Sequence, residues 1–190
     1  MAEDDPLRTA AAALRAGGVV AYPTEAVYGL GCDPRQAAAL ARLLALKQRP
    51  AERGLILIAS EFDQLAPFLA PLDAAREARC AATWPGPVTW AWPAAPDLPA
   101  ALTGGRGTLA VRVTAHPVAA ALCRAFGGAL VSTSANPHGS PPARDADAVR
   151  TAFGAAFGAA LDAVLDGPCG GAVGPTEIRD ALTGAVLRAG

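Results

Sequence analysis

The residues that could do chemistry in this chain are concentrated in three short polar segments. Residues 22–31 read Tyr-Pro-Thr-Glu-Ala-Val-Tyr-Gly-Leu-Gly, residues 47–49 read Lys-Gln-Arg, and residues 132–136 read Ser-Thr-Ser-Ala-Asn. Hydroxyl, amide and cationic groups of this kind bind phosphates and carboxylates, and no segment pairs a nucleophile with a base. The segments therefore predict a site for phosphoryl or nucleotidyl transfer, which needs little from a protein besides positioned charge and Mg²⁺.

Two residue types occur once each, and both fall in these segments. Lys47 is the only lysine among 16 basic residues, the rest being arginine, and Asn136 is the only asparagine. If arginine has replaced lysine wherever only a positive charge was needed, lysine survives where a compact ammonium is required. We therefore expect a specific role for Lys47. Chance is the alternative, because a chain this poor in lysine keeps its last one somewhere.

Several familiar catalytic motifs are absent from the sequence. The chain has no Gly-x-x-x-x-Gly-Lys-Ser/Thr, no Gly-x-Gly-x-x-Gly that opens a helix, and no Gly-x-Ser-x-Gly; these absences exclude a P-loop NTPase and disfavour a serine hydrolase. His116 and His138 have no nucleophile partner by sequence, so we expect each to be a cap or loop residue rather than a general base.

The composition is that of a near-neutral globular protein. With 190 residues, 52% hydrophobic residues, 17% charged residues and a net charge of −1, the chain is neither a disordered acidic tail nor a basic nucleic-acid coat. A near-neutral chain can still contain a local basic cleft. The candidate is the run Arg35, Arg42, Lys47, Arg49 and Arg53, for which a solvated helix face is the alternative.

The cysteines and the N-terminus indicate a cytoplasmic protein. The four cysteines, Cys32, Cys80, Cys123 and Cys169, are more than forty residues apart, so no zinc site is expected and they read as small buried hydrophobes in a reducing compartment. The acidic N-terminus has no apolar signal core, and no apolar run is long enough to span a membrane.

Hydrophobic spacing predicts helices that alternate with short apolar strands, the pattern of an α/β fold. The expected helices cover residues 7–16, 35–47, 61–69, 73–83, 117–126 and 145–157. The expected strands cover residues 19–22, 55–58, 88–92, 108–113 and 129–132, with others near 164–165, 177–178 and 185–187. Residues 93–107 are expected to form a loop. No repeat or long linker divides the chain, so we expect one domain over residues 1–190.

The polar residues of interest lie near the ends of the expected strands, where ligands bind in open α/β sheets. Any one of them could be a cap or turn residue, but together they indicate a site. They are Thr24 after the first strand, Lys47 and Arg49 before the second, Thr108 and Arg112 on another, Ser132, Ser134 and Asn136 following the next, and Arg188 at the end of the last.

Six motifs together resemble those of the YrdC family, in order from about residue 7 to residue 190. They are Tyr-Pro-Thr-Glu-Ala-Val-Tyr-Gly-Leu-Gly, Lys-Gln-Arg-Pro, Trp-Pro-Gly-Pro-Val-Thr, Leu-Ala-Val-Arg-Val, Ser-Thr-Ser-Ala-Asn and Gly-Pro-Thr-Glu-Ile-Arg-Asp. The chain is most similar to the short, single-domain bacterial branch of that family. The resemblance implies one domain with a twisted, mostly parallel or mixed sheet and helices around a deep basic cleft.

The resemblance also implies an activity, the synthesis of L-threonylcarbamoyl-AMP. In the family, L-threonine, bicarbonate or CO₂, and ATP give this product and pyrophosphate, with Mg²⁺ accompanying ATP and no metal ligand expected from the protein. A TsaD-type transferase complex then forms threonylcarbamoyladenosine beside the tRNA anticodon. The implied partners are these small molecules and this complex, with at most a weak contact to tRNA and none to a membrane.

The same resemblance implies roles for ten residues. Lys47 and Arg49 are the implied catalytic residues on the ATP phosphates, and Arg112 is implied to bind the threonine carboxylate, for which a guanidinium is suited. The residues implied in nucleotide binding are Lys47, Arg49, Thr108, Ser134, Asn136 and Arg188. The residues implied in threonine binding are Thr24, Arg112, Ser132 and Thr176.

Three positions depart from the family pattern. Thr176 stands where serine is usual, Ala26 stands where many relatives have threonine, and Ala59 falls near a position that is often histidine in the longer relatives. We therefore expect the threonine contacts to differ in detail.

Two other functions compete with this one. An RNA-binding protein would use the basic cleft, but it would carry aromatic residues among its arginines, and only 5% of this chain is aromatic. Carbamoyl transfer in hydrogenase maturation also uses a YrdC-like domain, but it needs an acylphosphatase-like domain and zinc motifs that the sequence lacks.

Overall fold

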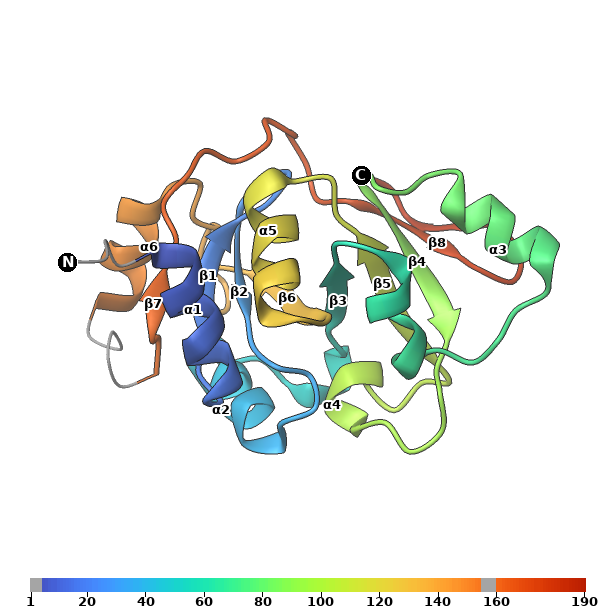
Figure 1. Ribbon diagram of the computed structural model, residues 1–190, viewed down its shortest axis with the longest axis horizontal. Coiled ribbons are helices and arrows are strands. Elements are labelled where there is room, and N and C mark those ends of the chain that lie inside the picture. The colour runs from blue at the N-terminus through green and yellow to red at the C-terminus, as the bar shows by residue number, and fades with distance from the viewer. Residues whose placement is uncertain (1–4, 155–159) are drawn as a thin grey trace.

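The structure is a computed structural model that describes residues 5–154 and 160–190 (Figure 1). The described α-helices are α1 (Pro6–Arg15), α2 (Ala37–Lys47), α3 (Ala74–Ala81), α4 (Ala100–Thr103), α5 (Pro117–Phe126) and α6 (Ala146–Phe153). Three short 3₁₀ turns are η1 (Ala51–Arg53), η2 (Phe62–Gln64) and η3 (Ala66–Phe68). The strands are β1 (Val20–Pro23), β2 (Tyr28–Gly31), β3 (Ile56–Ala59), β4 (Val88–Pro93), β5 (Thr108–Val113), β6 (Leu130–Ser134), β7 (Ala163–Val164), β8 (Glu177–Asp180) and β9 (Val186–Arg188).

The described strands form one sheet in the order β7-β1-β2-β6-β3-β5-β4-β8-β9. Three neighbouring pairs are parallel, namely β1 with β7, β3 with β5, and β4 with β8. The other neighbouring pairs in that order are antiparallel. The α/β class and the mixed sheet are confirmed, whereas a mostly parallel sheet is wrong for the described strands. The reason is that tight connections such as β1–β2 and β8–β9 join only antiparallel neighbours.

Helices cover both faces of the central strands. α1 and α5 lie together on one face (Figure 1), where Leu14 and Leu122 pack in the same buried cluster as Ile58 of β3. The preceding strand residue, Leu57, belongs to the other cluster, together with Leu43 of α2. Because alternate residues of a strand point to opposite faces, a strand buried on both faces is apolar throughout. This explains the continuous apolar run that predicted β3.

Two predicted segments differ from the structure for local reasons. Residues 61–69 form the separate turns η2 and η3 instead of one α-helix, because Pro67 has no N–H to donate to the preceding turn and its ring would clash there. The predicted loop at residues 93–107 contains the single-turn helix α4. The predicted helix at 145–157 begins as α6, but its residues 155–157 lie outside the described part of the chain.

The largest correction concerns β2, which the sequence did not predict. Glycine disfavours strands, and both Gly29 and Gly31 lie in this one. The packing requires them: a Cβ on Gly31 would lie 2.6 Å from the carbonyl oxygen of Val131 and 2.7 Å from the ring of Tyr22. Glycine therefore marks a close approach between β2 and its neighbours rather than a turn.

β6 ends two residues later than the predicted strand, and this changes the place of Ser134. β2 pairs with β6 so that Gly29 lies opposite Ser134 and Leu30 opposite Thr133. Ser134 therefore lies on the strand, as Ser132 does, rather than after it. Their side chains are held by sheet geometry and not by a loop.

Two further expectations concerned the cysteines and membrane-spanning segments. Three of the cysteines, Cys32, Cys80 and Cys123, are buried and free, as expected of small hydrophobes, and Cys169 is half-buried and free. Among the described helices, none is both long and apolar enough to cross a membrane.

We expect Gly31→Ala to destabilise the fold, because the added methyl group meets backbone and a buried ring. Overpacking of this kind costs about 1–3 kcal/mol, measured as the free energy of unfolding in urea. Gly107→Ala is the matched control, since a Cβ at Gly107 has nothing within 4 Å. Equal stability of the two variants would contradict the packing argument.

Candidate functional site

Two adjoining cavities contain eight of the ten residues that the sequence singles out. The polar cavity has a volume of about 190 Å³, and the arginine cavity has a volume of about 300 Å³. They share Arg49 and Arg188, so they are parts of one site. Of the expected residues, the polar cavity is lined by Thr24, Arg49, Arg112, Ser132, Ser134, Thr176 and Arg188, and the arginine cavity by Arg49, Thr108 and Arg188.

Hydroxyl groups line the polar cavity because β2, β6 and the β1–β2 connection meet there. Thr24 lies in the β1–β2 connection, where its Oγ1 donates to the carbonyl of Val27 at 2.6 Å. Ser132 lies on β6, two residues before Ser134, which pairs with Gly29 of β2. A Cβ on Gly29 would be 3.2 Å from both Ser132 Oγ and Thr24 Cγ2. The glycine leaves just enough space for the two hydroxyl-bearing side chains to flank the strand.

The arginine cavity is lined by four guanidinium groups, and none of its described lining residues is acidic. They belong to Arg49, Arg53, Arg106 and Arg188. Burial, followed by the charges of Arg53, Arg106 and Arg188, lowers the pKa of Arg49. The Nε of Arg49 is buried and has no hydrogen-bond partner among the described residues. An accumulation of like charge with an unused donor is the electrostatic signature of a polyanion site. The depth of the cleft stays a prediction.

The predicted basic run at the start of the chain divides between this cavity and other places. Arg49 and Arg53 line the arginine cavity, whereas Arg42 forms an ion pair with Asp162 at 3.0 Å. Arg35 lies over the ring of Phe68, 5.8 Å from its centroid. Arg49 and Arg53 therefore belong to a binding surface, whereas Arg35 and Arg42 make structural contacts.

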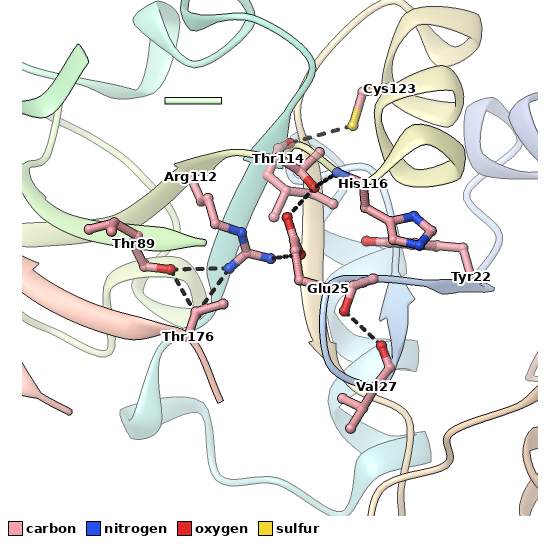
Figure 2. A network of polar contacts seen from close by, with 12 residues as sticks. Tyr22, Glu25, Val27, Thr89, Arg112, Thr114, His116, Cys123 and Thr176 are labelled. Atoms are coloured by element: carbon pink, nitrogen blue, oxygen red, sulfur yellow. Dashed lines mark hydrogen bonds and ion pairs between the residues drawn. The ribbon is translucent and has the colours of Figure 1, made fainter. Parts of the chain in front are cut away.

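Arg112 of β5 is the centre of a buried polar network at the other end of the site (Figure 2). Its Nη1 donates to the hydroxyls of Thr89 and Thr176, at 3.1 Å and 3.2 Å, and its Nη2 donates to Glu25 Oε2 at 3.2 Å. The hydroxyl of Thr114 donates to the second oxygen of Glu25 at 2.6 Å. Arg112 is 4% exposed and Glu25 9%, so this is a buried ion pair.

The charge of Glu25 is stabilised by its partners. Burial alone would raise the pKa of the Glu25 carboxyl, but the Arg112 guanidinium and the Thr114 hydroxyl outweigh it, so that the pKa falls below its usual value of 4.5. Glu25 is therefore an anion at neutral pH, and both of its oxygens already accept hydrogen bonds. Such a carboxylate is a poor general base.

His116 supports this network from behind. Its backbone N–H donates to Thr114 Oγ1 at 3.1 Å, and its ring Nε2 lies 3.0 Å from the carbonyl oxygen of Pro168. His116 precedes α5 at the N-cap position, although its side chain makes no capping hydrogen bond. The expected cap position is confirmed, and the buried ring is an anchor for the segment that follows β7.

Lys47 and Asn136 are the two expected residues that line neither cavity. Lys47 is 4% exposed, and its Nζ donates to the carbonyl oxygens of Ser134 and Asn136, at 2.6 Å and 3.0 Å. It also contacts Asn136 Oδ1 at 2.8 Å and Ser134 Oγ at 3.2 Å. The lone lysine thus ties the end of α2 to the end of β6, and in this arrangement it positions Ser134 on the cavity wall. Its contact with ATP phosphates stays a prediction.

The sequence did not single out three residues of the network, namely Glu25, Thr89 and Thr114. Thr89 forms a 3.1 Å hydroxyl contact with Thr176 and is fully buried. One signal was available for Glu25, since it is the only acidic residue between Asp5 and Asp33 and lies two residues after the end of β1. A carboxylate at such a place needs a buried partner.

The two alanine departures have different surroundings. Ala26 lines the polar cavity, next to Thr24 and Val27. Ala59 is fully buried at the end of β3, opposite Val113 of β5, and it belongs to the apolar core. Only Ala26 is placed to alter contacts with a ligand.

Comparison with known proteins agrees with this architecture. The family model Sua5/YciO/YrdC, described as "Telomere recombination", matches residues 12–190. The threonylcarbamoyl-AMP synthases of Halorhodospira halophila and Alkalilimnicola ehrlichii are each 62% identical to the chain, over 96% of it and over 93% and 95% of their own lengths. The structure of P. abyssi Sua5 complexed with L-threonine is similar with a TM-score of 0.86 and 32% identity, over 96% of this chain. The chain spans about half of that protein, 53% of its length.

We expect Lys47 to titrate with a pKa of about 8, because burial, followed by the charge of Arg49, lowers its pKa from 10.5. Since the chain has one lysine, protein labelled with ¹³C at lysine Cε gives a single lysine signal. The signal is followed by NMR through the alkaline range. Arg49→Met should move the midpoint upward, because it removes the second cause. A midpoint at the ordinary lysine value in the unchanged protein would contradict the buried position.

Proposed function

This chain belongs to the Sua5/YciO/YrdC family, and on that basis we propose that it synthesises L-threonylcarbamoyl-AMP from L-threonine, bicarbonate or CO₂, and ATP, releasing pyrophosphate. One structural observation carries the proposal. A cavity with a buried guanidinium and hydroxyl groups adjoins a cavity with four arginines, and the two share Arg49 and Arg188. The first cavity matches an amino acid, which carries one carboxylate and several hydrogen-bonding groups. The second matches a triphosphate, which carries several negative charges.

The polar cavity suits the amino acid. Arg112 is the cation at its inner end, and a guanidinium binds a carboxylate through two parallel N–H groups. Thr24, Ser132 and Thr176 supply hydroxyls for the amino group and side-chain hydroxyl. At about 190 Å³ the cavity holds a molecule of amino-acid size and leaves no room for a nucleotide. L-Threonine is also the ligand named for the P. abyssi Sua5 structure.

The arginine cavity suits ATP. Arg49, Arg53, Arg106 and Arg188 provide the positive charge for the phosphates, and Thr108 provides a hydroxyl. Apolar residues on the same walls, including Leu102 and Ile178, provide a surface for the base. Lys47 and Asn136 hold Ser134 on the wall of the polar cavity, and their contribution to nucleotide binding would be made where this cavity joins the arginine cavity.

The reaction needs orientation more than acid–base chemistry. The neutral amine of threonine adds to CO₂ and gives up a proton to water, which forms a carbamate. A carbamate oxygen then attacks the α-phosphorus of ATP while the bond from that phosphorus to the bridging β-phosphate oxygen breaks and pyrophosphate leaves. The carbamate oxygen is already anionic, so the attack on phosphorus needs no general base. Arg112 holds the carboxylate, and the arginine cavity holds the triphosphate in line with it, which converts a bimolecular step into a positioned one.

The site fits a magnesium ion that arrives with ATP. Its described lining residues offer hydroxyls and cations but no carboxylate, and the described part of the chain contains no cluster of three or more potential metal-ligating His, Cys, Asp or Glu residues. Phosphate oxygens and water would therefore be the ligands, as Mg²⁺ prefers in nucleotide sites. The bound ion would neutralise the charge that develops on pyrophosphate.

The chemical lability of the product indicates how it reaches the next enzyme. A mixed anhydride of a carbamate and AMP hydrolyses readily, so it suits direct transfer to a TsaD-type complex that modifies the adenosine beside the tRNA anticodon. We place the reaction in the cytoplasm, where tRNA is modified in bacteria.

RNA is at most a secondary ligand of this protein. A weak contact with tRNA is compatible with the exposed arginines. RNA binding as the main function is disfavoured, because the site consists of two small cavities rather than an extended groove with stacked aromatic rings.

The test is threonine-dependent release of pyrophosphate from ATP in the presence of Mg²⁺ and bicarbonate. We expect threonine to be preferred over serine at subsaturating concentration, because one methyl group in a fitted pocket contributes about 1–3 kcal/mol of discrimination. Omitting the amino acid is the control. Pyrophosphate release that is independent of threonine, or equal with serine, would contradict the proposal.

We expect Arg112→Lys and Arg188→Ala to affect different substrates. Lysine keeps a counter-charge for Glu25 but loses the planar fork, so the KM for threonine should rise on the order of tenfold while the KM for ATP changes little. Arg112→Ala is avoided because it would leave a buried charge without a partner. Arg188 is exposed on β9, and its Nη2 donates to the carbonyl oxygen of Thr176 at 2.7 Å. We therefore expect Arg188→Ala to fold and to raise mainly the KM for ATP. The same pattern in both variants would refute the division of the site.

A further inference from the structure

Arg112 is held on two opposite sides, and this is the starting observation. Thr89 of β4 and Thr176, which precedes β8, accept from Nη1 on one side, and Glu25 accepts from Nη2 on the other (Figure 2). Without Glu25 the guanidinium would be anchored through one nitrogen only and could pivot about it. Glu25 therefore fixes the plane of the group.

The position of Glu25 is itself determined by long-range contacts. In the strand order, β6 and β3 separate β2 from β5, and three strand spacings amount to about 14 Å. A 3.2 Å contact between Glu25 and Arg112 thus requires the β1–β2 connection to fold back over the sheet. Backbone hydrogen bonds hold it there: Gly170 N–H donates to Thr24 O and Ala172 N–H donates to Glu25 O, each at 3.0 Å.

Thr114 completes the restraint on Glu25. Its hydroxyl donates to Oε1 at 2.6 Å while Arg112 occupies Oε2, so the carboxylate is gripped at both oxygens. Thr114 follows Val113, the last residue of β5, and its own hydroxyl accepts from His116 N–H at 3.1 Å. Arg112 on β5 and Thr114, which directly follows this strand, therefore hold the two oxygens of Glu25 from the same segment.

We propose that Glu25 is a positioning residue that orients the Arg112 guanidinium so that its remaining N–H groups face the carboxylate of bound threonine. The inference rests on the proposed function, because it assigns threonine to Arg112. Glu25 does not touch the reacting atoms. Its effect is on recognition of the amino acid, and it leaves the nucleotide end of the site unchanged.

The direct experiment compares Glu25→Gln with the unchanged protein. Glutamine has nearly the same shape but no charge, and it cannot offer two acceptor oxygens to Arg112 and Thr114 together. We expect the KM for threonine to rise on the order of tenfold with the KM for ATP within about twofold, since only a ground-state contact to one substrate is weakened. An unchanged or lower KM for threonine would overturn the proposal; a lower value would mean that Glu25 competes with the substrate carboxylate.

A second readout needs no substrate. The ¹⁵N–¹H signals of the Arg112 guanidinium, assigned with Arg112→Lys, should be resolved and protected from exchange in the unchanged protein and lost in Glu25→Gln. Protection that persists in the variant would show that Glu25 does not hold the group. If the unchanged protein releases no threonine-dependent pyrophosphate, the proposed function fails, and the NMR comparison still decides whether Glu25 orients Arg112.

Two further variants separate positioning from stability. Asp162→Asn is the matched control, because Asp162 also pairs with an arginine, Arg42, at 3.0 Å and accepts from Val19 N–H at 2.8 Å, far from the site in sequence and function. It should lower the melting temperature without changing either KM. If Glu25→Gln does not fold, Thr114→Val replaces it. This variant keeps the ion pair of Glu25 with Arg112 and removes the hydrogen bond to Glu25 Oε1, so the KM for threonine should still rise. An unchanged KM in Thr114→Val would overturn the proposal.

Discussion

The buried pair of Glu25 and Arg112 is the interaction on which the polar cavity depends. Each charge would cost several kcal/mol to bury alone, so each is tolerated only because the other is present. The partners are 87 residues apart in the sequence and lie on elements that are not neighbours in the sheet. Together with the backbone hydrogen bonds from Gly170 and Ala172, their contact fixes where the β1–β2 connection closes over β5, and with it the position of Thr24 on the cavity wall.

Cations in the site fall into two physical classes. Arg112 and Lys47 are buried, and protein oxygens surround their charged groups, so they define geometry. Arg49, Arg53, Arg106 and Arg188 form no ion pair with a described carboxylate, and they line one cavity, where a bound anion would reduce the repulsion among them. Arg112 and Lys47 therefore fix the shape of the site before a ligand binds. The four arginines of the arginine cavity remain available to bind the phosphates.

Local patterns predicted part of the fold well. β5 and α5 have the predicted bounds, because an alternating apolar strand and a helix that begins at proline and ends at glycine are unambiguous signals. The failures have identifiable causes. β2 was missed because its glycines are selected by contact with Val131 and Tyr22, which lie elsewhere in the chain. Residues 61–69 were misread because apolar spacing outweighed Pro67 in the prediction.

Motif order and residue chemistry are properties of the chain, and they were enough to assign the family, the α/β class and eight residues that line the two cavities. The partners of those residues became known from the packed structure. It placed Lys47 against Ser134 and Asn136, and it paired Arg112 with Glu25, Thr89 and Thr176. Such pairings depend on strand order and on how far a connection folds back over the sheet. Neither is encoded in local spacing, because contacts between distant segments form only when the whole core packs.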